Sequence, residues 1–136
     1  MSIPEHAVSI ELDVQFNHCD PLGVVWHGRY FEYFEAARTA LMRSIDLDVA
    51  EIRDLGYKLF VVDARCRYMR SLSYGDRARC TAWFTKPNPH VRIAFELYNL
   101  SHSARVARST MVFAVTKHDG TLLTEVPSVF MSKLPS

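Results

Sequence analysis

The sequence has few of the residues that mark specialised folds. Its three cysteines, Cys19, Cys66 and Cys80, are odd in number and none forms a CxxC pair, which argues against a disulfide framework or a zinc site. Five glycines and six prolines in 136 residues exclude a collagen-like composition. We therefore expect a chain that relies on a hydrophobic core, with its cysteines reduced.

An excess of one charge and a long apolar run are also lacking. Sixteen basic and 15 acidic residues leave a formal charge of +1, which gives no general field to attract nucleic acid or anionic lipid. No apolar run approaches the roughly 20 residues that a membrane helix needs. Residues 1–7 have no basic segment followed by an apolar signal core. These absences predict a cytoplasmic protein that binds neither nucleic acid nor membrane.

What the chain has is enough apolar material for one core. Hydrophobic residues make up 49% of it and charged residues 23%, and a chain of this length buries roughly two-thirds of its unfolded surface. Without a linker or repeat, residues 1–136 are predicted to form a single domain. Aromatic residues, 12% of the whole, crowd between Phe16 and Phe34, which marks that segment for function.

The spacing of the apolar residues changes twice in the first third of the chain. Apolar residues alternate from Val8 to Phe16, which predicts a strand with one buried face. A turn follows at Asp20-Pro21-Leu22-Gly23. Spacings of three and four then place apolar residues on one face of a helix over residues 29–45. A capping box at Asp48 and Glu51 predicts a short second helix, which Gly56 ends.

The remainder of the chain alternates as strands separated by short turns, one of them at Pro87-Asn88-Pro89. The strands are predicted over residues 60–68, 78–84, 91–97, 104–115 and 126–131. Short connections favour antiparallel neighbours. An apolar helix and a one-faced meander can both be buried only if the sheet curls around the helix. The fold class is therefore predicted as α+β, a hotdog arrangement of a long helix wrapped by five to six antiparallel strands.

The loop before the helix holds the candidate chemistry. The start of the helix, Val25-Trp26-His27-Gly28-Arg29, offers no Ser, Thr, Asp or Asn cap, so its free N–H groups are available to an oxyanion or to water, and Gly28 could itself serve as the cap. Asp20 lies in the same loop beside apolar Val24, Val25 and Trp26, a setting that favours a base or nucleophile. The alternative is a turn-forming aspartate that binds its own backbone.

The run from Asn17 to Arg38 resembles the signature of the 4-hydroxybenzoyl-CoA thioesterase family of hotdog acyl-CoA thioesterases. The resemblance continues through Val62 to Tyr68 and through Tyr74-Gly75-Asp76. It implies hydrolysis of an acyl-CoA or acyl-carrier-protein thioester without metal or other cofactor.

The resemblance also implies roles for single residues. Asp20 would be the catalytic base or nucleophile, and His27 would polarise the thioester carbonyl with its backbone N–H. The residues implied to bind substrate are Gly23, Val24, Val25, Trp26 and Tyr30. The family forms homodimers or homotetramers with the site between subunits, so the same assembly is expected here. Three positions, His18, Arg29 and Ser71, depart from the family pattern and leave the acyl group open, whether aryl or short to medium chain.

Other interpretations of these residues are weighed against this one. A metal site at His18, Cys19 and Asp20 and a Cys19 nucleophile are disfavoured, and Glu35 is interpreted as an ion pair with Arg38. The arginines that alternate along two strands are interpreted as a solvated surface; they are Arg65, Arg67, Arg70, Arg77 and Arg79. The family resemblance implies that one or two of them hold CoA phosphates. Two other functions stay open: a hotdog 3-hydroxyacyl-thioester dehydratase, and a non-catalytic acyl-thioester-binding protein.

Overall fold

The protein is built on one curved antiparallel sheet. The computed structural model describes residues 3–87 and 89–135, so Asn88 of the predicted turn lies outside the described residues. The strands lie in the order β1-β3-β4-β5-β2, and each neighbouring pair is antiparallel. Their bounds are β1 Val8–Asp13, β2 Tyr57–Tyr68, β3 Arg77–Thr85, β4 Val91–Asn99 and β5 Ala104–Lys117. The strand order leaves β1 and β2 as the two edges.

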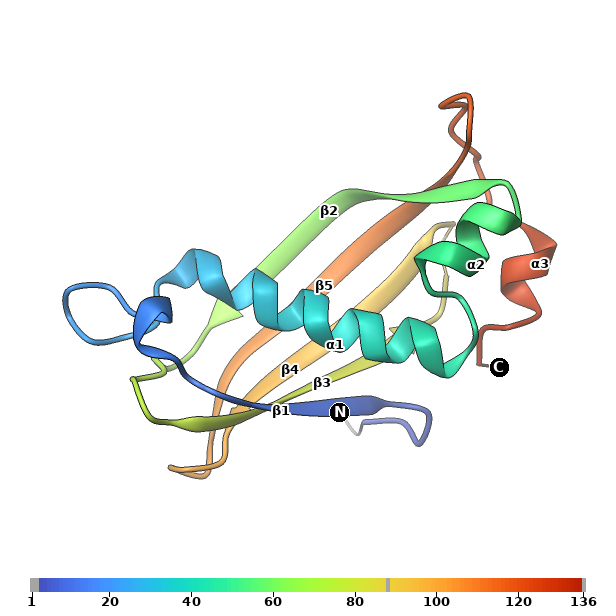
Figure 1. Ribbon diagram of the computed structural model, residues 1–136. Helices are drawn as coiled ribbons and strands as arrows, with labels where there is room; N and C mark the ends of the chain where they lie inside the picture. The colour runs from blue at the N-terminus through green and yellow to red at the C-terminus, as the bar shows by residue number, and fades with distance from the viewer. Residues whose placement is uncertain (1–2, 88, 136) are drawn as a thin grey trace.

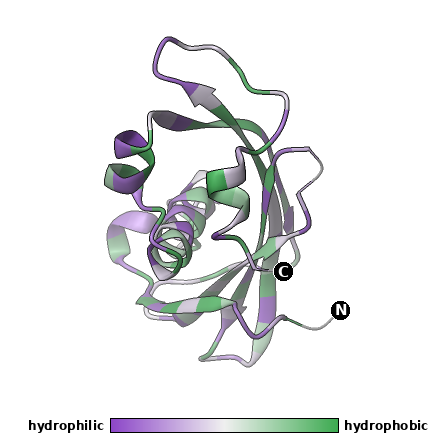
Figure 2. Cartoon of the chain, turned by 90° about the vertical axis from the view of Figure 1, so that its right-hand side faces the viewer, coloured by the Kyte–Doolittle hydropathy of each residue, from purple (hydrophilic) through white to green (hydrophobic). Residues whose placement is uncertain are grey.

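A single long helix crosses one face of this sheet. Helix α1, Tyr30–Ser44, follows a short 3-10 turn, η2, at His27–Arg29, and Figure 1 shows it lying across the strands. The view in Figure 2 shows the sheet curving around the helix. The α+β hotdog arrangement predicted from the sequence is confirmed, with five strands.

The predicted helical stripe forms the centre of the core. Tyr30, Phe34, Ala37 and Leu41 are all at most 2% exposed, and the Phe34 ring lies 5.2 Å from that of Phe95 in β4. The partly buried Arg38 binds Glu35 in the expected ion pair, and its guanidinium lies 5.0 Å from the centre of the Phe113 ring. Even the polar side of the helix is therefore tied to the sheet.

The first strand is shorter than predicted. β1 ends at Asp13, and residues Phe16–His18 form a 3-10 turn, η1. One further bond, from the Val14 N–H to the Asp76 carbonyl at 2.9 Å, continues the pairing with β3, and the chain then turns at Gln15, whose N–H bonds to His18 Nδ1 at 3.2 Å. Phe16 was expected on the buried face, but it is 76% exposed and packs edge-on against Tyr74.

The second strand contains an irregularity that the sequence pattern conceals. Val61 pairs with Phe113 and Asp63 with Val112, so Val62 is an extra residue in a β-bulge. Leu59, before the bulge, and Cys66, after it, both pack against the core although their numbers differ in parity. The expected buried face was therefore wrong in its first half: Phe60 and Val62 are 59% and 45% exposed.

The predicted last strand is a helix. Residues Ser128–Met131 form α3, and the Pro127 carbonyl accepts hydrogen bonds from the Phe130 and Met131 N–H groups at 3.0 Å. Pro127 has no N–H to give to a strand ladder and readily starts a helix. Phe130, 1% exposed, fastens α3 to the core.

The short helix α2, Val49–Asp54, confirms its predicted capping box. The Asp48 N–H bonds to Glu51 Oε1 at 3.0 Å, and the Asp48 side chain binds the first N–H groups of the helix. Gly56 follows with a φ of +93°, a conformation that suits glycine. Among the helices of the described residues, none is long and apolar enough to cross a membrane.

Candidate active site

Asp20 lies in a tight hairpin that projects beyond one end of α1. Cys19 pairs with Val25, and the Asp20 N–H bonds to the Val24 carbonyl at 2.8 Å. The turn closes with a bond of 2.9 Å from the Gly23 N–H to the Asp20 carbonyl, and Gly23 has a φ of +82°. Glycine suits this position because side chains disfavour that region. Gly23 thus shapes the hairpin, as expected.

The two oxygens of the Asp20 carboxylate differ in their surroundings. Oδ1 accepts a hydrogen bond from the Leu22 N–H at 2.9 Å, which is the turn-forming role that the sequence left open. Oδ2 has no hydrogen-bond partner among residues 3–87 and 89–135, and the side chain is half-buried. One oxygen therefore orients the carboxylate while the other stays available for chemistry.

The hairpin is held in place by the segment after β2. The Val25 N–H bonds to the Leu72 carbonyl at 2.8 Å, and Val24 bridges to Ser73. Asp76 in turn accepts hydrogen bonds from the Ser73 N–H at 2.9 Å and from Asn99 Nδ2 at 3.0 Å. Asp76 is only 8% exposed. The Tyr74-Gly75-Asp76 motif therefore fixes the support of the hairpin rather than contacting substrate.

The start of α1 is open to a ligand. Neither η2 nor α1 has a side-chain cap, so the sequence prediction of uncapped N–H groups at His27 is confirmed. The His27 carbonyl accepts a hydrogen bond from the Tyr68 hydroxyl at 2.9 Å, which orients this peptide from the neighbouring strand. The positive end of the helix is thus exposed beside a fixed turn.

A groove of about 360 Å³ opens beside this turn. Its lining residues are Val25, His27, Tyr30, Tyr68, Met69, Arg70 and Ser71. The structure therefore brings together three of the residues predicted from the sequence, Val25, His27 and Tyr30. Asp20, Gly23, Val24 and Trp26 do not line the groove; they belong to the hairpin and its base.

The sequence did not place the residues Tyr68 to Ser71 in the groove. Arg70 was expected only among the arginines that could hold CoA phosphates, and Ser71 only as a departure from the family pattern. Their part in the groove depends on how close β2 runs to α1.

Trp26 and Gly28 form a close stack at the rim. A Cβ added to Gly28 would lie 2.3 Å from the Trp26 ring, so the ring rests directly on the glycine. Trp26 is 52% exposed and its ring lies 5.1 Å from that of His27. The small residue at position 28 lets the indole lie directly against the turn η2.

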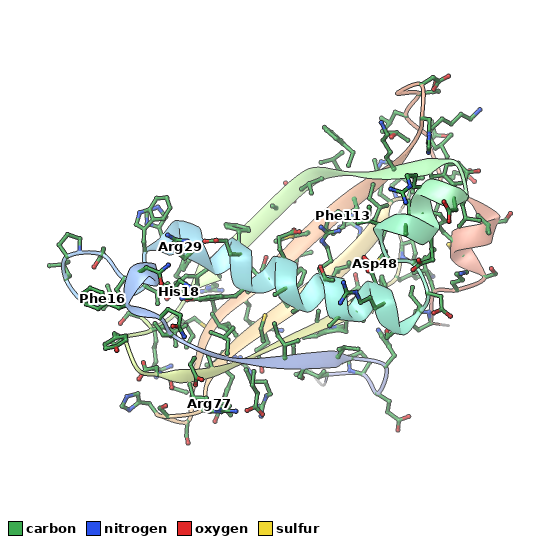
Figure 3. The ribbon with its side chains drawn as sticks, viewed as in Figure 1. Phe16, His18, Arg29, Asp48, Arg77 and Phe113 are labelled. Carbon is green, nitrogen blue, oxygen red and sulfur yellow. The ribbon has the colours of Figure 1, made fainter. Side chains whose placement is uncertain are left out.

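His18 serves the framework of the site. Its Nδ1 accepts the Gln15 N–H at 3.2 Å and lies 2.9 Å from the Tyr33 hydroxyl, while its carbonyl accepts the Trp26 N–H at 3.1 Å. Figure 3 shows His18 beside Arg29, at the end of α1 that carries the hairpin. Cys19 Sγ is directed to the Gln15 carbonyl at 3.7 Å, so no Cys–His pair forms there. The described part of the chain holds no cluster of His, Cys, Asp and Glu that could bind a metal.

The phenols and the thiol around the groove are neutral at ordinary pH. Burial is the main cause that raises the pKa of Tyr30, and it raises the pKa of Tyr68 to about 12 with help from Cys66. Burial also raises the pKa of Cys66. These groups can donate hydrogen bonds, but they are poor bases.

Comparison with known proteins identifies relatives of the chain. Residues 14–134 match the model of the thioesterase-like superfamily. Over 113 residues, 82% of each chain, the sequence is 25% identical to the "Putative acyl-CoA thioesterase YneP" of Bacillus subtilis. Over 77 residues it is 40% identical to the "Putative esterase sll0410" of Synechocystis, covering 57% of this chain and 46% of that protein. The matches span about half the length of the first two curated relatives, 46% and 49%.

A solved structure shares the fold across nearly the whole chain. The 1,4-dihydroxy-2-naphthoyl-CoA thioesterase Slr0204 from Synechocystis superposes with a TM-score of 0.81 at 18% identity, covering 94% of this chain and 95% of that one. At this identity the likeness establishes the architecture alone.

Proposed function

The chain belongs to the thioesterase-like superfamily, and from that premise we propose that it hydrolyses the thioester of an acyl-CoA or acyl-carrier protein. The acyl group is aryl or of short to medium length, and the products are the free acid and the thiol. The observation that carries the proposal is the uncapped start of α1, which opens on a groove, together with a carboxylate that keeps one oxygen free in the hairpin ending at Val25 of that groove.

In the proposed reaction, Asp20 acts through Oδ2 as a general base on water or as the nucleophile itself. The carbonyl oxygen of the thioester lies against the N–H groups at His27, where the developing negative charge is stabilised by the helix start. When Asp20 acts as the base, the C–S bond breaks and the thiolate takes the proton that Asp20 removed from water. When Asp20 is the nucleophile, breaking of the C–S bond leaves an acyl–aspartyl anhydride; water then hydrolyses this anhydride to the free acid and supplies the proton for the thiolate. A thioester needs only a base and an oxyanion site because its thiol is a good leaving group.

The groove is also proposed to bind the substrate. Val25 and Tyr30, at 5% and 2% exposure, form an apolar wall for the acyl group, and Trp26 covers the rim above Gly28. Gly23 and Val24 contribute by holding the hairpin against Ser73. No metal or organic cofactor takes part in the proposed mechanism.

The decisive experiment compares two aspartates with the same local geometry. Asp119 Oδ1 accepts the Thr121 N–H at 2.9 Å, just as Asp20 Oδ1 accepts the Leu22 N–H. Asparagine preserves this turn at both positions. Thiol release from a panel of acyl-CoAs is expected to fall by about 10² to 10⁴ in Asp20→Asn and to stay unchanged in Asp119→Asn.

The same panel separates the alternative functions. Unchanged turnover in Asp20→Asn would remove that residue from the mechanism. Tight acyl-CoA binding without thiol release by the unaltered protein would favour a non-catalytic binding protein. A change in enoyl absorbance without free thiol would favour a dehydratase.

We further propose that two copies of the chain pair through β2. This edge strand exposes Phe60, Val61 and Val62, at 59%, 45% and 45%, and an exposed apolar edge invites another strand. An isologous pair would join the two sheets. The dimer, or a tetramer built from two dimers, would then place the partner's chain beside the groove.

A further inference from the structure

Tyr68 ends β2 beside the start of α1, where it lines the candidate groove. Its hydroxyl donates a hydrogen bond of 2.9 Å to the carbonyl of His27, which lies 41 residues away in the sequence. Figure 1 shows the end of β2 close to the first turn of α1. The proposed reaction uses the backbone of this turn, so a side chain that binds this backbone can affect the chemistry.

The Tyr68 side chain is held in one orientation. Its backbone pairs with Ala107 in β5, and the N–H of the next residue bonds to the Val106 carbonyl at 2.8 Å. The Tyr68 ring meets the Tyr30 ring at 4.9 Å and 64° and the His27 ring at 6.4 Å and 86°. The sheet and two rings therefore place the hydroxyl before a substrate arrives.

The bond from Tyr68 acts on the peptide that joins His27 to Gly28. A trans peptide carries its C=O and its N–H on opposite sides, so a donor that fixes the His27 carbonyl also fixes the direction of the Gly28 N–H. The same carbonyl accepts the N–H of Tyr30 in the first turn of the helix. With its carbonyl directed into the helix, this peptide points its N–H out of the helix start.

The turn presents two consecutive N–H groups without a partner. Within residues 3–87 and 89–135, neither the His27 N–H nor the Gly28 N–H forms a hydrogen bond. The neighbours on both sides are satisfied: the Trp26 N–H bonds to the His18 carbonyl at 3.1 Å, and the Arg29 N–H bonds to the Trp26 carbonyl at 2.9 Å. Hydrogen bonds in a chain polarise one another, so the bond from Tyr68 also makes the Gly28 N–H a stronger donor.

We propose that Tyr68 is a positioning residue for the hydrolysis: through the His27 carbonyl it directs the Gly28 N–H toward the oxygen of the thioester. The Gly28 N–H then acts beside the His27 N–H on the negative charge that develops on this oxygen. The inference rests on the proposed function and adds to it a second donor and the side chain that holds this donor.

The Tyr68 hydroxyl acts through the backbone and not on the substrate itself. A phenol has one hydrogen to donate, and the His27 carbonyl takes it. Burial, with help from Cys66, raises the pKa of Tyr68 to about 12, so the hydroxyl keeps this proton at ordinary pH. Tyr68 is therefore neither the base nor a direct donor to the oxyanion.

The sequence allows the Gly28 N–H to be observed alone, because His27-Gly28 is the only His–Gly pair in the chain. Protein with ¹³C at the histidine carbonyls and ¹⁵N at the glycines gives one signal in a carbonyl-filtered NMR spectrum. In Tyr68→Phe, which keeps the ring and removes the hydroxyl, this signal is expected to shift. The matched control, Tyr57→Phe at the other end of β2, should leave the signal in place.

The amide analogue of an acyl-CoA, in which NH replaces the thioester sulfur, tests the donor directly. Its carbonyl should move the Gly28 signal of the unaltered protein and move it less in Tyr68→Phe. This measurement needs no turnover. Absence of thiol release by the unaltered protein would contradict the proposed function, whereas the Gly28 signal decides the role of Tyr68 separately.

Kinetics measure the consequence for the reaction. Thiol release by Tyr68→Phe should show a kcat lower by about tenfold, as for one lost hydrogen bond, and a KM within about twofold of the unaltered value. Such a split marks an interaction that stabilises the transition state more than the bound substrate. Tyr57→Phe should match the unaltered protein in both constants.

Three results would overturn the role of Tyr68. The first is a Gly28 signal that is the same in Tyr68→Phe and in the unaltered protein, since the hydroxyl would then not direct this peptide. The second is a Gly28 signal that the amide analogue does not move. The third is an unchanged kcat in Tyr68→Phe, with or without a raised KM, which would make Tyr68 only a wall of the groove.

Discussion

At the scale of single residues, the hydrogen bonds of the site hold part of a side chain in place and leave the rest of it free. Asp20 uses one oxygen to fix its turn and keeps the other free. Its residue type and its turn could be predicted from the sequence, because Pro21 and Gly23 accompany it. The direction of its carboxylate could not, since that depends on the support of Leu72 and Ser73 from a distant segment.

Tyr33 gives a prediction of pH dependence at this scale. It is 6% exposed, and burial is the main cause that raises its pKa from 10.0 to about 12. The unfolded chain therefore loses this proton before the folded chain does, so stability is complete below about pH 10 and falls as the pH rises toward about 12. The Tyr33→Phe variant should lose about 1 to 3 kcal/mol less stability over this range.

Urea unfolding at about pH 8 and about pH 11 measures the effect. At the lower pH, Tyr33→Phe should be less stable by about 1 kcal/mol because the bond to His18 is lost. Tyr74→Phe, at a position 62% exposed, is the control and should follow the unaltered protein. Parallel alkaline losses in all three proteins would refute the role of Tyr33.

At the scale of elements, the sequence predicted the helices and strands whose apolar residues recur at a regular spacing. It failed where other contacts determine the local structure. Helix α1 and strands β3, β4 and β5 follow their patterns, and the capping box of α2 forms as predicted. β1 was predicted too long because Val14 and Phe16 keep the alternation, although the chain turns between them into η1. The last segment was predicted as a strand because Val126, Phe130 and their neighbours are apolar, although Pro127 favours the helix that forms.

Helix α3 gives a prediction of stability. Phe130 is 1% exposed and meets the Tyr57 ring edge-on at 5.6 Å, whereas Met131 beside it is 46% exposed. Phe130→Ala should lower the free energy of unfolding by about 3 to 5 kcal/mol. Met131→Ala should change it by less than about 1 kcal/mol. Equal effects in urea unfolding would mean that α3 does not close the core.

At the scale of the whole molecule, the exposed edge of β2 carries the proposed assembly. Under the proposed pairing, Val61→Lys/Val62→Lys should shift the protein toward monomer, because charged side chains on an edge oppose strand pairing. Val49→Lys, at a position 71% exposed on α2, should leave the assembly unchanged. Sedimentation velocity measures both. A monomeric unaltered protein would contradict the proposed dimer.

The candidate groove depends on contacts between distant parts of the chain, and this explains why the site was predicted only in part. Val25, His27 and Tyr30 lie close in sequence, so one local motif identified them. Tyr68 to Ser71 reach the groove only through the long-range pairing of β2 with β5. A single sequence carries no mark of that approach.

The extra residue Val62 changes which sequence positions face the core: odd-numbered residues face it before the bulge and even-numbered residues after it. With it, Cys66 faces the core while Arg65 and Arg67 face the opposite side. Deletion of Val62 alone would place Asp63 next to Val61 while both keep their partners Val112 and Phe113, so neither face of the strand would change. Only the bulge and its local twist would be lost. The bulge is therefore a position at which β2 can lose one residue while the end of the strand keeps its register beside the candidate active site.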